Sequence, residues 1–213
     1  PVLGSRAVLS LEGDLIIVLY FLTIPTVCSF LAGWYSRSVY STIGSFRTLT
    51  QMFAYEVPLF MALLAPALIA KTWSVSEMTS FYSQNPLYIL INLPALAVAL
   101  VTSQGKLERS PFDLPEAETE IVSGAYVEYS GRLLAIFKMT IDCELVLMAS
   151  LISAIFLPFV TGSAIINLIL YFLKTIAVLM VLALMRVAMA RLRMDQMMNF
   201  CWKYLTPVAA TQM

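Results

Sequence analysis

The chain contains no histidine, and its cysteines, Cys28, Cys143 and Cys201, lie far apart in the sequence. Histidine is the usual ligand of a membrane haem, while iron–sulfur and zinc sites need closely spaced cysteines. The sequence also has no glycine-rich loop of the kind that binds nucleotide phosphates. We therefore expect no metal and no redox or nucleotide cofactor to be bound by this chain itself.

Charge is scarce as well. Only 12% of the residues are charged, and 13 basic residues balance 13 acidic ones, so the formal net charge is zero. No basic tract interleaved with aromatic residues is present, which argues against nucleic acid as a partner. Hydrophobic residues make up 60% of the 213 residues, and the mean hydropathy is +0.85. A soluble core of this length could not bury so much apolar surface, so the composition indicates a protein that crosses a lipid bilayer several times.

Long apolar runs predict an all-α, polytopic membrane helix bundle that forms a single domain over residues 1–213. A membrane-spanning helix needs about 20 mostly apolar residues. The expected spans are residues 15–32, 49–70, 86–103, 133–157, 164–185 and 195–211. Pro25, Pro58 and Pro94 lie inside spans, so tilted and proline-broken helices are expected. The polar and aromatic stretch at 33–48 reads as a connection at the level of the lipid headgroups.

Basic residues in the connections predict the orientation, because Lys and Arg near span ends favour the cytoplasmic side. Alternate connections carry them, and the remaining connections contain only Lys71. The basic residues of the cytoplasmic connections are Arg37, Arg47, Lys106, Arg109, Arg132, Arg186, Arg191 and Arg193. The sequence therefore predicts a multi-pass protein of the cell membrane, with the loop at residues 105–131 on the cytoplasmic side.

This loop is polar and strongly acidic. Its acids are Glu108, Asp113, Glu116, Glu118, Glu120 and Glu128. Like charges within about 4–6 Å disfavour each other's ionised forms, so these acids are expected to titrate as a coupled set. Lys106 and Arg109 are their expected charge partners, and Lys106 is expected to pair with Glu108 or Asp113. Composition alone favours the simpler alternative that the loop is a solvated acidic face.

Three further acids, Glu56, Asp142 and Glu144, fall inside expected spans. A carboxylate at the bilayer centre costs roughly 2.5–3.5 kcal/mol on insertion scales, so it normally faces the bundle interior and marks an ion or proton path. Structural alternatives exist for each. Glu56 lies near a span end and could reach the interface, and Lys138 could pair with Asp142 one helical turn further on.

Three sequence blocks resemble the signatures of one family. The blocks are GWYSRSVYSTIGSFRTLTQMFAYEVPL, ERSPFDLPEAETEIVSGAYVEYSG and RLRMDQMMNFCWKYLTPVA. They look like the signatures of the subunit 1 (H subunit) family of respiratory complex I and of the related membrane-bound NiFe hydrogenases. The resemblance covers the chain from its first span to its end. It implies a bundle of tilted, partly broken helices that docks a redox arm, and it implies that the two spans beginning the family's fold are absent from this sequence.

The resemblance also implies roles for individual residues. Glu56 matches an intramembrane glutamate of the family in its Tyr-Glu-Val motif. Arg47 matches an arginine on the way to a quinone cavity, and Arg37 is placed with it as an arm-docking residue. The matching acids of the cytoplasmic loop are Glu116, Glu118, Glu120 and Glu128. The family uses such acids to link redox events in the peripheral arm to a proton path through the membrane.

Two departures from the complex I pattern favour the hydrogenase-like or sulfur-reducing branch. Lys106 stands where complex I has a glutamate, and Ile141 stands where its next acid falls. The expected protein is a membrane anchor without a redox centre, partnered by iron–sulfur and hydrogenase-like arm subunits and by antiporter-like membrane subunits. Iron–sulfur clusters, and in hydrogenase relatives a NiFe centre, belong to those partners. The alternatives are a quinone-site subunit of an NADH:quinone oxidoreductase and a stand-alone secondary transporter.

Overall fold

The computed structural model describes residues 11–115, 118–159 and 164–213, and every regular element in these ranges is helical. The helices are α1 (Asp14–Tyr35), α2 (Val39–Ala70), α3 (Val75–Gln84), α4 (Leu87–Ile91), α5 (Leu93–Lys106), α6 (Glu118–Ile121), the 3-10 turn η1 (Gly124–Tyr126), α7 (Gly131–Phe156), α8 (Ala164–Ala188), α9 (Met194–Phe200), the π-helical turn η2 (Cys201–Leu205) and α10 (Thr206–Ala210). The predicted all-α membrane bundle is confirmed.

Helices α1, α2, α7 and α8 are long and apolar enough to cross a membrane, among the residues that the structure describes. With 32 residues, α2 measures about 48 Å at 1.5 Å per residue, whereas the hydrocarbon core of a bilayer is about 30 Å thick. One end of α2 therefore extends beyond the lipid unless the helix is strongly tilted.

The predicted connection at 33–48 is wrong over most of its length, because α2 already begins at Val39. Small residues explain the error. Ser41, Gly44, Ser45 and Thr48 recur at helical spacing on the buried face of α2. The hydroxyl of Ser45 donates to the carbonyl of Ser41 at 2.7 Å, and that of Thr48 donates to the carbonyl of Gly44 at 3.2 Å. Their polarity is thus satisfied within the helix, although in the sequence it resembles that of a loop.

The expected span at 86–103 is divided at Asn92 into α4 and α5. Pro94 lies in the first turn of α5, where a residue without an N–H is tolerated, and this favours a new helix start there. Pro25, Pro58 and Pro66 lie inside continuous helices instead. The expected last span, 195–211, corresponds to α9, η2 and α10, which follow one another without a break. Which of these segments lie in lipid stays a prediction.

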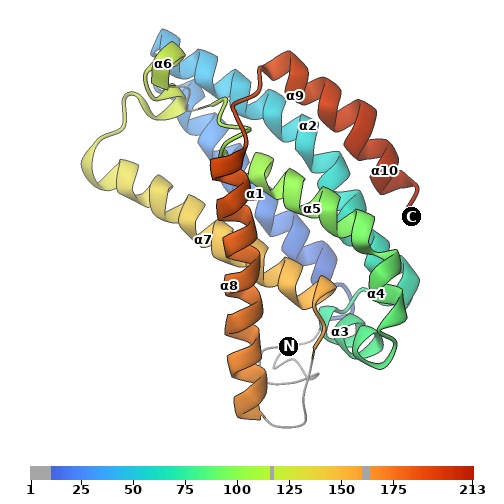
Figure 1. The fold of residues 1–213 in the computed structure, drawn as a ribbon. Coiled ribbons are helices and arrows are strands. Elements are labelled where there is room, and N and C mark those ends of the chain that lie inside the picture. The colour runs from blue at the N-terminus through green and yellow to red at the C-terminus, as the bar shows by residue number, and fades with distance from the viewer. Residues whose placement is uncertain (1–10, 116–117, 160–163) are drawn as a thin grey trace.

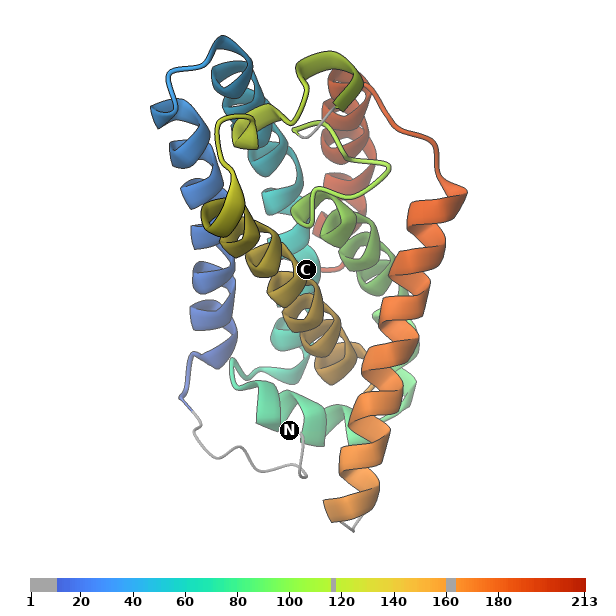
Figure 2. The same ribbon diagram turned by 90° about the vertical axis from the view of Figure 1, so that its left-hand side faces the viewer.

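Helix α2 is the centre of the bundle, since it packs against α1, α5, α9 and α10. Figures 1 and 2 show α6 and the start of α2 at one end of the bundle and the short helices α3 and α4 at the other. Helix α7 runs obliquely between these ends and packs against α8, which it crosses. The acidic loop, which joins α5 to α7, therefore covers the end of the bundle where α2 begins.

Glycines let this loop lie directly on α1 and α2. Gly124 has φ +55°, and a Cβ at this position would overlap the carbonyl oxygen of Pro115. A Cβ on Gly44 would press against the backbone of Gly124 and Ala125. The hydroxyl of Ser41 donates to the carbonyl of Ala125 at 2.9 Å. The loop is thus fastened to the helices by close backbone contact.

Candidate functional site

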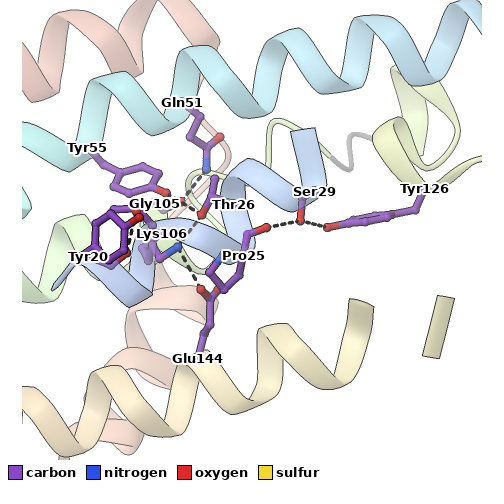
Figure 3. A network of polar contacts seen from close by, with 11 residues as sticks. Tyr20, Pro25, Thr26, Ser29, Gln51, Tyr55, Gly105, Lys106, Tyr126 and Glu144 are labelled. Atoms are coloured by element: carbon purple, nitrogen blue, oxygen red, sulfur yellow. Dashed lines mark hydrogen bonds and ion pairs between the residues drawn. The ribbon is translucent and has the colours of Figure 1, made fainter. Parts of the chain in front are cut away.

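A buried ion pair lies where α5 meets α7. The Nζ atom of Lys106, at the end of α5, is 3.0 Å from Oε1 of Glu144 in α7, and the two side chains are only 3% and 8% exposed. Lys106 also donates a hydrogen bond to the hydroxyl of Thr26 in α1. Figure 3 shows the lysine between these two partners. Both charges lie inside the protein, where each needs the other to offset the loss of water.

Helix α2 closes the site on its other side. The hydroxyl of Tyr55 is 3.3 Å from that of Thr26, and the Nε2 atom of Gln51 donates to the carbonyl of Gly105 at 2.8 Å. Gly105 directly precedes Lys106, so Gln51 fixes the backbone from which the lysine extends (Figure 3). Four helices, α1, α2, α5 and α7, thus converge on one ammonium group.

The expected partners of Lys106 were Glu108 and Asp113, but the ion pair observed at 3.0 Å is with Glu144. The physical reason is the length of α5. The helix continues through Lys106, so the lysine is directed into the bundle instead of belonging to the loop. Glu144 was expected inside a span, and the structure places it on the buried face of α7.

Two cavities are lined by one or both members of this pair, and a further cavity shares a lining residue with one of them. The first, about 200 Å³, lies among charged groups that include Glu108, Asp113 and Asp142. The second, about 280 Å³, is lined by Glu108, Lys106 and Glu144, and the third, about 570 Å³, has mainly apolar walls with Glu144 among them. Glu108 therefore lines both the first and second cavities, and Glu144 lines both the second and third. Successive cavities thus share an acidic residue in their linings.

The first cavity is bordered by a second ion pair. Nη2 of Arg109 donates to Oδ1 of Asp142 at 3.1 Å, and the Asp142 side chain is 73% exposed. The expected partner of Asp142 was Lys138, whose Nζ lies 5.7 Å from the ring centre of Tyr126. Arg109 comes from the acidic loop and Asp142 from α7, so this pair joins the loop to the helix that carries Glu144.

A third ion pair joins the loop to α2. Nη1 of Arg47 donates to Oε2 of Glu120 at 2.6 Å, and Nη2 of Arg191 is 3.7 Å from the other carboxylate oxygen of Glu120. The hydrogen bond and charge of Arg47 lower the pKa of Glu120 below its ordinary value. Glu120 thus acts as an exposed anchor for α6.

The attachment of α6 is expected to depend on pH. Because the folded-state pKa of Glu120 is lowered, the stabilisation is fully present above the ordinary carboxyl pKa of about 4.3 and is lost as the pH falls through the lowered value. Hydrogen–deuterium exchange of residues 118–121, corrected for the intrinsic rate, should accelerate in that acid range. Arg47→Gln should produce the faster exchange already at neutral pH. A profile that this substitution leaves unchanged would show that the pair does not hold α6.

The remaining expected site residues are dispersed. Glu56 lies half-buried near the middle of α2, within electrostatic range of Lys106, but it lines none of the three cavities. Glu128 follows η1, and Arg37 precedes α2 with φ +58°. Glu116 and the side chain of Glu118 lie outside the described part of the chain. Within that part, no group of three or more Cys, Asp or Glu side chains is arranged to hold a metal ion.

Sequence reasoning missed the neutral members of the site, namely Thr26, Ser29, Gln51, Tyr55 and Tyr126. A usable signal was present for two of them. Thr26 follows a proline in the middle of an apolar run, and Gln51 lies one helical turn before Tyr55 on the same face of α2. Tyr126 gives no such signal, because its position depends on how the loop folds back onto α1.

The sequence model of the NADH dehydrogenase family matches residues 1–213. The chain belongs to this family. The H subunit of NADH-quinone oxidoreductase from Bacillus thuringiensis subsp. konkukian is 36% identical over 199 residues, as is the protein of the same name from Bacillus anthracis strain A0248. The predicted membership of the H subunit family is confirmed.

Family relationships also extend to solved structures. A chain of the membrane-bound sulfane sulfur reductase, an archaeal respiratory membrane complex, superposes with a TM-score of 0.87 at 29% identity, covering 99% of this chain and 71% of that one. The alignments with the two Bacillus proteins cover 90% of this chain and 60% of each relative. The chain thus spans about three fifths of the length of these curated relatives.

Proposed function

We propose that this protein is the membrane-anchor subunit of a complex I-related respiratory assembly and that it couples electron transfer in a peripheral arm to proton movement through the membrane. Its membership of the NADH dehydrogenase family supports the assembly. The observation that supports the coupling is the buried Lys106–Glu144 pair, whose glutamate lies on α7, a helix long and apolar enough to cross a membrane.

A buried ion pair is an expensive way to stabilise a membrane bundle. Removing each ion from water costs several kcal/mol, and well-packed apolar residues often serve stability as well or better. Ionisable groups inside membrane bundles therefore point to ion or proton paths. Glu144 lines two cavities, which supports access of protons to its carboxylate.

The proposed path starts at the acidic loop on the cytoplasmic side. A proton enters the first cavity, passes by way of Glu108 into the second, and is taken up by the Glu144 carboxylate. Lys106 then loses its ionic partner, and the uncompensated ammonium favours release of a proton from the pair. Each transfer moves one proton between oxygen or nitrogen atoms, so charge is conserved at every step.

Protons suit this site better than sodium ions. The ammonium of Lys106 already supplies the positive charge beside Glu144, and it would repel a second cation. A sodium ion needs several oxygen ligands in place of that ammonium. The site thus offers proton exchange between a carboxylate and an amine.

The arm subunits would carry the iron–sulfur clusters and, in a hydrogenase-like assembly, a NiFe centre. Lys106 at the position of a complex I glutamate and the likeness to a sulfur-reductase chain support the hydrogenase-like or sulfur-reducing branch. The second candidate is a quinone-site subunit, which the names of the Bacillus relatives favour. Mass spectrometry of the intact native complex separates the two, since it identifies the arm subunits and any bound quinone. Antiporter-like membrane subunits are expected in either assembly.

Glu144→Gln is expected to abolish proton translocation by the native complex in proteoliposomes while electron transfer continues in part. Glutamine keeps the shape of the side chain but cannot accept a proton. The matched control is Glu77→Gln, an exposed acid in the first turn of α3, which should translocate normally.

Glu56→Gln serves as the comparison within the membrane. Normal translocation by Glu144→Gln together with its loss in Glu56→Gln would move the proton path from the α5–α7 pair to α2. Normal translocation by both variants would contradict a proton path through this bundle.

A further inference from the structure

A chain of hydroxyl groups leads from the acidic loop to α1, the helix whose Thr26 accepts a hydrogen bond from Lys106. The hydroxyl of Tyr126, in η1, donates to the hydroxyl of Ser29 at 2.8 Å, and Ser29 donates to the carbonyl of Pro25 at 3.0 Å. Tyr126 is 3% exposed and Ser29 is 8% exposed. Figure 3 shows this chain beside the Lys106–Glu144 pair. One buried hydrogen bond therefore ties the loop to the middle of α1, and a second, within α1, continues from Ser29 to Pro25.

The attachment point lies at a weak place in α1. Pro25 has no N–H, so the backbone hydrogen bond that would normally reach the carbonyl of Phe21 is missing. Thr26, the residue that accepts the hydrogen bond from Lys106, follows immediately. The half of α1 that carries Thr26 and Ser29 is thus the half that Tyr126 holds, and it joins the other half at the proline.

The same groups share one cavity. Thr26, Ser29, Lys106, Tyr126 and Glu144 all line the second cavity of about 280 Å³. A small movement of α1 at this place has room and changes the distance from Thr26 to Lys106 directly. The chain of hydroxyls does not itself conduct protons, because it ends at a carbonyl oxygen that has no proton to pass on.

We infer that Tyr126 is a positioning residue, which transmits movement of the acidic loop through Ser29 and Thr26 to the Lys106–Glu144 pair. This inference rests on the proposed proton path and adds the element that would link it to the arm. When the loop holds α1, Thr26 and Glu144 share the ammonium of Lys106. When the loop moves, Thr26 is withdrawn and the pair changes its proton affinity.

The chain offers a matched control for Tyr126. Tyr129 lies in the same loop, packs against the same ring of Phe137, and also donates its hydroxyl to α1, to the carbonyl of Ala32 at 2.9 Å. Ala32 is about two helical turns from Pro25, away from Lys106. Removing either hydroxyl deletes one loop–α1 hydrogen bond, but only the hydroxyl of Tyr126 acts beside Thr26.

The test compares Tyr126→Phe and Tyr129→Phe in the native complex reconstituted in proteoliposomes, with reduced methyl viologen as the electron donor. Tyr126→Phe is expected to lower the number of protons moved per electron and to displace the pH profile, because loss of one hydrogen bond changes the proton equilibrium of the pair by about three- to tenfold. Tyr129→Phe should keep the wild-type ratio and profile. Ser29→Ala should give the same result as Tyr126→Phe. If the Tyr126→Phe complex does not assemble, Ser29→Ala is the variant to compare with Tyr129→Phe.

Equal effects of the two tyrosine variants would overturn the inference, because the loop would then need only to be attached. A wild-type ratio in Tyr126→Phe and Ser29→Ala would overturn it as well. Glu144→Gln, measured in parallel, tests the proton path independently of the role of Tyr126. If Glu144→Gln stops translocation while Tyr126→Phe does not, the path stands and only the role of Tyr126 is lost.

Discussion

Lys106→Met is expected to destabilise the protein and to stop proton translocation, whereas the double substitution Lys106→Met with Glu144→Met restores stability alone. Breaking a buried pair by removing one partner costs about 3–5 kcal/mol, since the remaining charge is left uncompensated. Replacing both partners by apolar residues of similar volume is often neutral or stabilising. The double variant therefore separates a structural role of the pair from a role in proton transfer.

Thermal unfolding of the purified complex, followed by tryptophan fluorescence, measures the first effect, and proton uptake in proteoliposomes measures the second. Lys203→Met is the control, because Lys203 is exposed in η2. Recovery of translocation in the double variant would show that neither ionisable group carries protons.

Gly124→Ala is expected to detach the acidic loop from the bundle. A left-handed conformation costs a residue with a Cβ roughly 1–2 kcal/mol, and forcing extra atoms into a packed site adds about 1–3 kcal/mol. Both penalties apply at Gly124, where the new methyl group would overlap the carbonyl of Pro115. The loop should then lose its contact with Gly44 and Ser41 of α2.

Gly131→Ala separates the cost of the left-handed conformation from the cost of the steric overlap. Gly131 also has a positive φ, +57°, but a Cβ there meets no atom within 4 Å. Limited proteolysis within residues 107–126 should be accelerated strongly by Gly124→Ala and only slightly by Gly131→Ala. Equal cleavage rates would mean that the close contact with Pro115 does not hold the loop.

The membrane bundle could be predicted because each spanning helix is recognisable from its own stretch of apolar residues. Apolar runs such as residues 164–185 need no tertiary information to be recognised, and α8 extends this run only to Ala188. The start of α2 could not be predicted in the same way. Its hydroxyl-bearing residues satisfy their polarity within the helix and against Ala125, a residue 84 positions away from Ser41.

The candidate site, too, has one part that the sequence predicts and one part that depends on tertiary structure. Glu144 could be found from the sequence, because an acidic residue in an apolar segment stands out whichever face of the helix it occupies. Its partner could not be found in this way. The pairing with Lys106 depends on where α5 ends and on which face of α7 is buried. Sequence proximity therefore led to Glu108 or Asp113 as the expected partner and could not reveal the 3.0 Å pair with Glu144.

The extended start of α2 affects how the protein fits bilayers of different thickness. Its inward side carries the hydroxyls of Ser41 and Ser45, but its outward side exposes the apolar residues Val39, Ile43 and Phe46. A thick bilayer can therefore cover these outer apolar residues beside the Arg47–Glu120 pair, and in a thin bilayer the start of α2 lies among the headgroups as a stable helix. In both cases the contact with Ala125 stays on the inner face, shielded from lipid. The height of the acidic loop above the site is then set by the helix and not by the membrane.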